Sequence, residues 1–165
     1  SYYKENINGI NLIEGESVGS KYPKDALYNI VRYKGYYIHN DFTEKNIRKY
    51  FYDNNIKQLK VKQGYTRCSL IPLPDLLISS DYGIYKSIKD KIDIRLVDND
   101  LVGLDGFDQG FLGGTCGLIG DKLIFTGDIS KHKAFPKIKE ICKGESIEII
   151  FPKTKLIDLG SIIDL

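Results

Sequence analysis

One pattern occurs three times along the sequence and constrains the fold more than any other feature. Its clearest copy, GFDQGFLGGTCGLIGDKLIFTGD at residues 106–128, has a glycine-rich turn, a cysteine beside a hydroxyl residue, two apolar runs and a final aspartate. A second copy is GYTRCSLIPLPDLLISSD at residues 64–81, and a shorter third is VRYKGYYIHND at residues 31–41. The final aspartates of the three copies are 40 and 47 residues apart. A period in this range predicts a repeat architecture.

Each copy begins a unit with the expected order strand, strand, helix, strand. One such unit cannot bury both its sheet and its helix, whereas repeated units packed around an axis can. We therefore predict an α/β fold in a single repeat domain over residues 1–165, arranged as an open ring or closed by a further segment or a neighbouring chain. The expected parts are a partial unit at 1–14, units at about 15–62, 63–97 and 98–151, and the start of a further unit at 152–165.

Apolar spacing and capping residues place the individual elements. Thr43 is expected to cap a helix that buries Ile47, Tyr50 and Phe51, and Asp81 is expected to cap a shorter one. The helix of the third unit should end at Gly144. The expected strands are Tyr28–Arg32, Tyr36–His39, 56–62, Cys68–Ile71, Leu76–Ser79, 92–96, Thr115–Ile119, Lys122–Thr126 and Ile147–Phe151.

Composition and charge limit the kinds of molecule that the protein is expected to bind. With 42% hydrophobic and 28% charged residues and a net charge of +2, we expect a soluble globular protein that binds neither nucleic acid nor a membrane. Three cysteines at unrelated spacings predict no disulfide framework, which favours a reducing, cytoplasmic setting. No paired His/Cys pattern predicts a zinc site. The glycine-rich turn precedes a strand rather than a helix, so no nucleotide cofactor is expected.

Several of these features resemble the pentein, or guanidine-group-modifying, superfamily. The resemblance is carried by the repeats, by GFLGG at residues 110–114, by GYTRCS at 64–69 and by HND at 39–41. The whole chain looks most like a bacterial branch of that superfamily. The resemblance implies a five-bladed α/β propeller of ββαβ units. The superfamily includes arginine and agmatine deiminases, dimethylarginine hydrolases and amidinotransferases.

The resemblance also implies catalytic roles. Cys68 would attack a guanidinium carbon, His39 would transfer protons, and Asp41 would help to hold the substrate cation. The residues themselves leave other interpretations open. Cys68 could be a small buried apolar residue, as free cysteines usually are, and His39 could be a strand-end residue hydrogen-bonded to the backbone.

Further residues are candidates for binding the substrate. Asp81, Asp105 and Asp128 could converge on a guanidinium, which needs carboxylates in a fork geometry. Helix capping and turn formation would explain the same aspartates. Gly113 and Gly114 would allow a close backbone approach at the centre of the ring.

Two functions are therefore expected from the sequence. The first is a cysteine-dependent guanidine-modifying enzyme, which transfers an amidino group or releases ammonia and uses no cofactor or metal. The second is a non-catalytic module of the same fold that binds a ligand or a protein partner. The small molecule expected for the chain is a guanidino or amidino compound. The presence of only two histidines, and the short separation between His39 and Cys68, favour the second.

Overall fold

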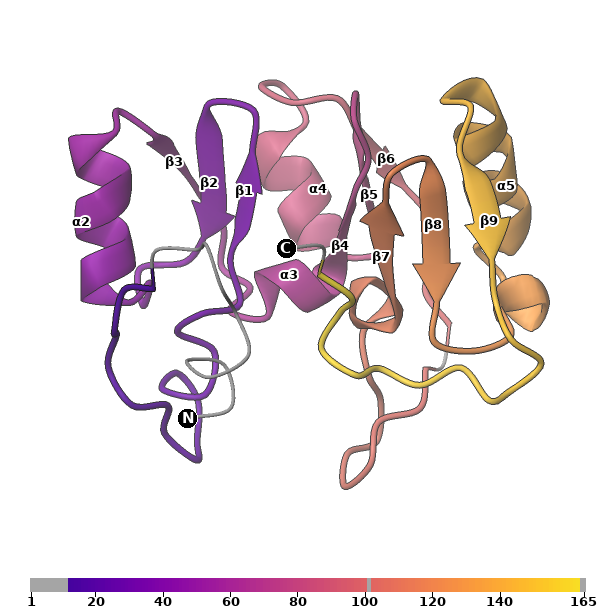
Figure 1. Ribbon diagram of the computed structural model, residues 1–165, viewed down its shortest axis with the longest axis horizontal. Coiled ribbons are helices and arrows are strands. Elements are labelled where there is room, and N and C mark those ends of the chain that lie inside the picture. The colour runs from indigo at the N-terminus through magenta and orange to yellow at the C-terminus, as the bar shows by residue number, and fades with distance from the viewer. Residues whose placement is uncertain (1–11, 101, 164–165) are drawn as a thin grey trace.

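The computed structural model describes residues 12–100 and 102–163, so most of the partial unit predicted at 1–14 lies outside the described residues. Three small three-stranded sheets lie side by side in the order of the chain (Figure 1). In each sheet two strands are antiparallel, and the third is parallel to the second. A helix precedes each third strand, which confirms the predicted order strand, strand, helix, strand. The described residues form no closed ring.

The bounds of the elements are as follows. The first unit contains β1 (Val31–Tyr33), β2 (Tyr36–His39), α2 (Lys45–Asp53) and β3 (Lys57–Lys60). The second unit contains α3 (Thr66–Ser69), β4 (Leu70–Pro72), β5 (Leu77–Ser79), α4 (Tyr82–Ile88) and β6 (Ile94–Leu96). The third unit contains the 3₁₀ helix η1 (Leu112–Thr115), β7 (Cys116–Ile119), β8 (Lys122–Phe125), the 3₁₀ helix η2 (Ile129–Lys131), α5 (Phe135–Gly144) and β9 (Glu148–Ile150).

The middle sheet joins the other two because both of its faces are buried. Neighbouring residues of a strand point to opposite faces. On β5, Leu77 belongs to the hydrophobic cluster shared with the first unit, and Ile78 belongs to the cluster shared with the third. Full burial of each such side chain is worth about 1.5–3 kcal/mol. The two clusters therefore fix how the three units pack.

The capping of α2 differs from the prediction. Glu44, and not Thr43, is the N-cap, and its carboxylate accepts the backbone N–H of Ile47 at 2.9 Å. The hydroxyl of Thr43 lies 2.8 Å from Nδ1 of the buried His39. Because Thr43 is engaged with the histidine, the next residue caps the helix. Of the residues predicted on the buried face of α2, Phe51 is buried, but Tyr50 is 46% exposed, so that part of the prediction is wrong.

The strand predicted at Cys68–Ile71 is wrong in its first half. Residues 66–69 form the short helix α3, in which the backbone N–H of Ser69 donates to the carbonyl of Tyr65 at 3.0 Å. Strand β4 begins only at Leu70. Arg67 and Cys68 therefore lie in one helical turn rather than on opposite faces of a strand.

The described part of the C-terminal segment, residues 152–163, passes beside the start of β7. The backbone N–H of Leu159 donates to the carbonyl of Gly114 at 3.0 Å, and that of Ile162 donates to the carbonyl of Cys116 at 3.2 Å. This segment therefore covers the end of the third unit that faces α3. No helix in the described residues is long and apolar enough to cross a membrane.

Candidate functional site

Cys68 lies where α3 meets η1, at the junction between the second and third units. It is 5% exposed, and Asn29 contacts it twice. Asn29 Nδ2 donates to Sγ at 3.0 Å, and Asn29 Oδ1 accepts the backbone N–H of Cys68 at 3.0 Å. The thiol also lies 3.7 Å from the carbonyl oxygen of Gly160. Three segments that are distant in sequence therefore enclose the thiol.

The surroundings of Cys68 favour the neutral thiol. Burial is the largest influence and raises the pKa of the thiol. The hydrogen bond from Asn29 and the charge of Arg67 lower that pKa, while the carboxylate of Asp158 raises it. The net pKa lies above its ordinary value, whereas a nucleophilic cysteine needs a lowered one. In this conformation Cys68 has the environment of a structural cysteine.

The guanidinium of Arg67 ties the junction together. Nη1 donates to the carbonyl of Leu70 at 3.1 Å and to that of Gly113 at 3.4 Å, and Nη2 donates to the carbonyl of Ile162 at 3.3 Å. One side chain thus links α3, η1 and the C-terminal segment. The charge of Arg67 also acts to lower the pKa of the neighbouring Cys68 thiol.

Gly113 and Gly114 lie where η1 closely approaches its neighbours, the end of α3 and the C-terminal segment. A Cβ on Gly113 would lie 2.5 Å from the carbonyl oxygen of Leu70 and 2.7 Å from that of Cys68. A Cβ on Gly114 would overlap the carboxylate of Asp158. Both positions therefore allow the close approach that only glycine permits. Their role in substrate binding stays a prediction.

Asp158 is a buried carboxylate that the sequence reasoning did not single out. It is 5% exposed and accepts the backbone N–H groups of Phe111 at 2.8 Å and Gly160 at 2.9 Å. Its sequence signal is a lone acidic residue in an apolar stretch, two residues before a glycine. An aspartate that bonds its own backbone two residues on is typical of a turn.

His39 is fully buried at the end of β2, and both ring nitrogens are engaged. Nδ1 lies 2.8 Å from the hydroxyl of Thr43, and Nε2 lies 2.9 Å from the carbonyl of Gly64. Burial is the largest influence on the ring and lowers its pKa. His39 thus links Gly64, at the start of the second copy, to the first unit. Its role as a proton carrier stays a prediction.

The candidate aspartates do not meet at one point. Asp41 is exposed and pairs with Lys60 at 2.5 Å. Asp105 is exposed in a turn beside Gly106, whose φ is +80°. Asp128 caps η2, and hydrogen bonds from Ser130 are the largest cause that lowers its pKa.

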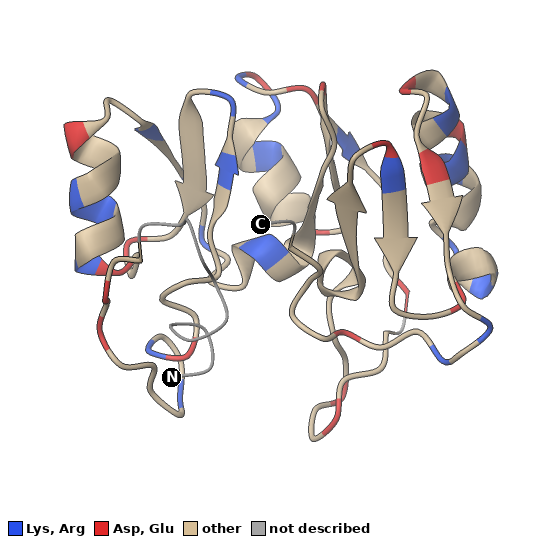
Figure 2. Ribbon diagram, in the orientation of Figure 1, with Lys and Arg blue, Asp and Glu red and all other residues tan. Residues whose placement is uncertain are grey.

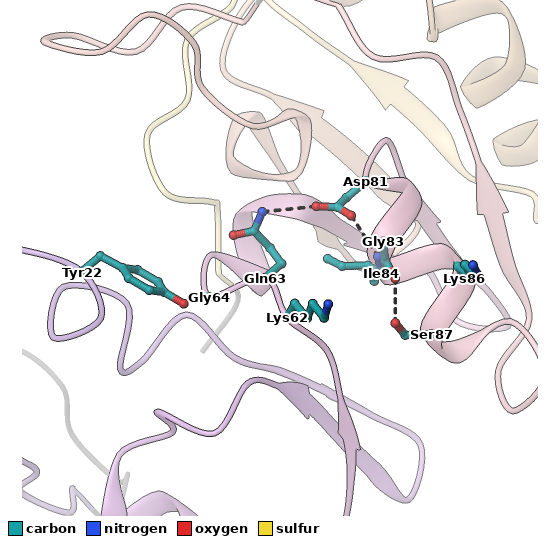
Figure 3. Close-up of a pocket in the computed structure, with 9 residues that line it drawn as sticks. All are labelled: Tyr22, Lys62, Gln63, Gly64, Asp81, Gly83, Ile84, Lys86 and Ser87. Atoms are coloured by element: carbon teal, nitrogen blue, oxygen red, sulfur yellow. Dashed lines mark hydrogen bonds between the residues drawn. The ribbon is translucent and has the colours of Figure 1, made fainter.

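Asp81 lines a cavity between the first two units. Its Oδ1 accepts the backbone N–H of Ile84 at 2.9 Å, which confirms that it caps α4, and its Oδ2 accepts Gln63 Nε2 at 3.2 Å. The cavity, which we call the Asp81 cavity, has a volume of about 500 Å³ and lies between the first two units. Its wall includes Tyr22, Lys62 and Lys86 (Figure 3).

Neither Cys68 nor His39 lines the Asp81 cavity. Asp81 does line a second, smaller cavity of about 270 Å³, together with Ser69 and Phe111. The structure therefore separates the two residues expected to perform covalent chemistry from the polar cavity between the units.

The chain was compared with known proteins. The model of a family of unknown function, DUF6873, matches residues 1–163. The chain belongs to this family. Comparisons with curated proteins and with solved structures found no match. Because the family description assigns no activity, the functional argument depends on the geometry of the site.

Proposed function

We propose that this member of the family is a binding module for a small guanidino or amidino compound, held in the Asp81 cavity. The observation that carries the proposal is the placement of Asp81, a carboxylate fixed at a helix N-cap on the wall of a 500 Å³ cavity. Small-molecule sites are typically cavities of about 300–1,000 Å³ with a few fixed polar groups.

The chemistry of the cavity suits a ligand that carries both charges. Each oxygen of Asp81 already accepts one hydrogen bond and retains a lone pair, so the carboxylate can also accept a forked guanidinium. The half-exposed ring of Tyr22 offers a face for a cation. Lys62 and Lys86 would bind a carboxylate at the other end of the ligand. A guanidino acid therefore fits better than a doubly charged amine.

Calorimetric titration with L-arginine, agmatine and L-citrulline tests the proposal. L-Arginine should bind best, because agmatine lacks the carboxylate and citrulline has a neutral ureido group. Asp81→Asn preserves a good N-cap and removes the charge, and it replaces the oxygen that accepts Gln63 Nε2 with an amide group. It should weaken L-arginine binding about 10- to 100-fold, since a hydrogen bond to a charged group is worth about 1.5–3 kcal/mol.

Asp41→Asn provides the matched control for the titration. It removes the same charge from an exposed position that does not line the Asp81 cavity, so it should leave the affinity unchanged. Equal binding of L-arginine by the wild type and by Asp81→Asn would refute the proposed site.

A second candidate, a cysteine-dependent guanidine-modifying enzyme, is favoured by one observation. Asn29 and Arg67 both act to lower the pKa of the Cys68 thiol, as a nucleophile requires. In the reaction the thiolate would add to the guanidinium carbon and ammonia would leave with a proton. Water would then hydrolyse the adduct to a ureido product. Ammonia release from arginine, agmatine or methylarginines that disappears in Cys68→Ser would support this candidate, and no release would count against it.

We also propose that the three units are blades of a pentein-like propeller. The repeated strand order and the burial of both faces of the middle sheet support this arrangement. An experimental structure in which the units at 29–62, 64–97 and 110–151 fail to superpose about one axis would refute it.

A further inference from the structure

A second polar cavity lies in the third unit, away from the Asp81 cavity. Its volume is about 350 Å³, and we call it the His132 cavity. Its polar wall consists of side chains from η2, from the loop before η1 and from the C-terminal segment. These side chains are Asp100, Asp108, Asp128, Lys131, His132 and Lys155. None of the residues that line it lines the Asp81 cavity.

The distinctive feature of this cavity is a buried donor. His132 is only 6% exposed, although its position among lysines predicts a solvated surface residue. Its Nδ1 accepts the backbone N–H of Ala134 at 3.1 Å. In the neutral ring the proton must then be on Nε2. Within the described residues, Nε2 is buried and has no partner at ordinary hydrogen-bond geometry, and its interaction with the backbone of Asp100 is a weak one that acts to raise the pKa of the ring.

A buried donor without a well-formed hydrogen bond is costly, so His132 Nε2 favours an additional acceptor oxygen. Two ammonium groups, those of Lys131 and Lys155, line the same cavity and favour an anionic acceptor over a neutral one. The carboxylates of Asp108 and Asp128 line it as well and favour a cationic group. The loop between β6 and η1 carries acidic residues and no basic ones, as the colouring in Figure 2 shows.

We propose that the His132 cavity binds a small α-amino acid. The ligand's carboxylate accepts the N–H of His132 Nε2, and its ammonium faces Asp108 and Asp128. A volume of about 350 Å³ is near the lower end of the range for small-molecule sites, which fits a single amino acid rather than a larger molecule. This site is separate from the proposed guanidino site and does not depend on it.

The two histidines allow a direct test by NMR. Long-range ¹H–¹⁵N spectra of the full chain report the tautomer and surroundings of each imidazole ring. L-Alanine is the probe, with L-lactate, which lacks the ammonium, and ethylamine, which lacks the carboxylate, as comparisons. L-Alanine should shift the His132 ring signals saturably. The signals of His39, whose nitrogens are both engaged elsewhere, should stay in place.

Variants locate the binding. Asp128→Asn removes the charge while an amide oxygen can still accept the N–H of Ser130. His132→Asn keeps an acceptor for Ala134, but its shorter side chain places no donor at the position of Nε2. Each should weaken L-alanine binding at least tenfold. Asp121→Asn, in the exposed turn between β7 and β8, is the matched control and should bind as the wild type does.

Three results would overturn the proposal. The first is the absence of a saturable shift of the His132 ring with L-alanine, which would leave only water in the cavity. The second is an equal shift with L-lactate or ethylamine, which would mean a site for a single charge. The third is unchanged binding by Asp128→Asn. Because Asp128 is partly exposed, this variant should fold, so weaker binding by it would not reflect unfolding. The wild-type titration decides the matter even if His132→Asn does not fold.

Discussion

Replacement of Gly113 by alanine tests the packing of the α3–η1 junction most directly. The added Cβ would lie 2.5 Å from the carbonyl oxygen of Leu70 and 2.7 Å from that of Cys68. Both oxygens belong to the backbone, so no flexible side chain can move aside. Either η1 or the corner between α3 and β4 must shift by several tenths of an ångström.

The size of the effect follows from two opposing contributions. Overpacking of a close contact costs about 1–3 kcal/mol. Replacing glycine by alanine lowers the conformational entropy of the unfolded chain, which stabilises the folded state by about 0.4–1 kcal/mol. The net loss in the free energy of unfolding should be about 1–2 kcal/mol. For a chain of this size that lowers Tm by about 2–8 °C.

Gly144→Ala is the matched control. No atom lies within 4 Å of a Cβ at Gly144, the last residue of α5, and alanine is favoured over glycine in a helix by about 0.5–1 kcal/mol. Thermal unfolding followed by circular dichroism should therefore give a lower Tm for Gly113→Ala and an equal or higher Tm for Gly144→Ala.

The thiol offers a second measurement on the same variant. A displaced α3 should expose Cys68, so the native Gly113→Ala protein should react faster with a thiol reagent than the wild type does. A Tm of Gly113→Ala at or above that of the wild type would show that the junction is not as closely packed as described.

Three further predictions concern single groups. Iodoacetamide labelling, read by peptide mass spectrometry, should modify Cys68 first, then Cys142 and finally Cys116, because burial raises the pKa of Cys142 to about 11 and that of Cys116 to about 12. Equal labelling would contradict the order. Because burial depresses the folded-state pKa of His39, its contribution to stability is complete above about pH 6.5 and is lost as the pH falls below that value. Tm should therefore drop on acidification, and less steeply in His39→Asn. Arg67→Lys cannot reproduce the three carbonyl contacts and should lower the free energy of unfolding by about 1.5–3 kcal/mol in urea titrations, whereas an unchanged midpoint would contradict this.

The sequence predicted the regular part of the fold because local patterns determine it. Alternating apolar residues located the strands of all three sheets, and Asp81 is the N-cap of α4 as expected. The helix of the third unit ends at Gly144, where its apolar stripe ends. The number of units in a ring depends on contacts between units, which no local pattern specifies.

The sequence did not predict the features that depend on contacts between distant residues. Cys68 lies in a helical turn because Asn29, 39 residues earlier, holds its backbone N–H and its thiol. His132 is buried although lysines flank it in sequence. Asp158 reaches the junction only because the C-terminal segment folds back along η1. Each case brings together segments whose separation in sequence hides the contact.

The two candidate functions differ in whether the C-terminal segment must move. Catalysis at Cys68 requires its displacement, which costs free energy. For Cys68 to reach a substrate, at least residues 159–162 would have to leave the junction. That movement would break the contact from the thiol, the bond from Arg67, and the backbone bonds to Gly114 and Cys116. At about 1 kcal/mol each, these contacts keep the open state roughly a thousand times less populated than the closed one. Binding in the Asp81 cavity needs no such opening, so a catalytic cycle at Cys68 requires a substrate that itself stabilises the displaced segment.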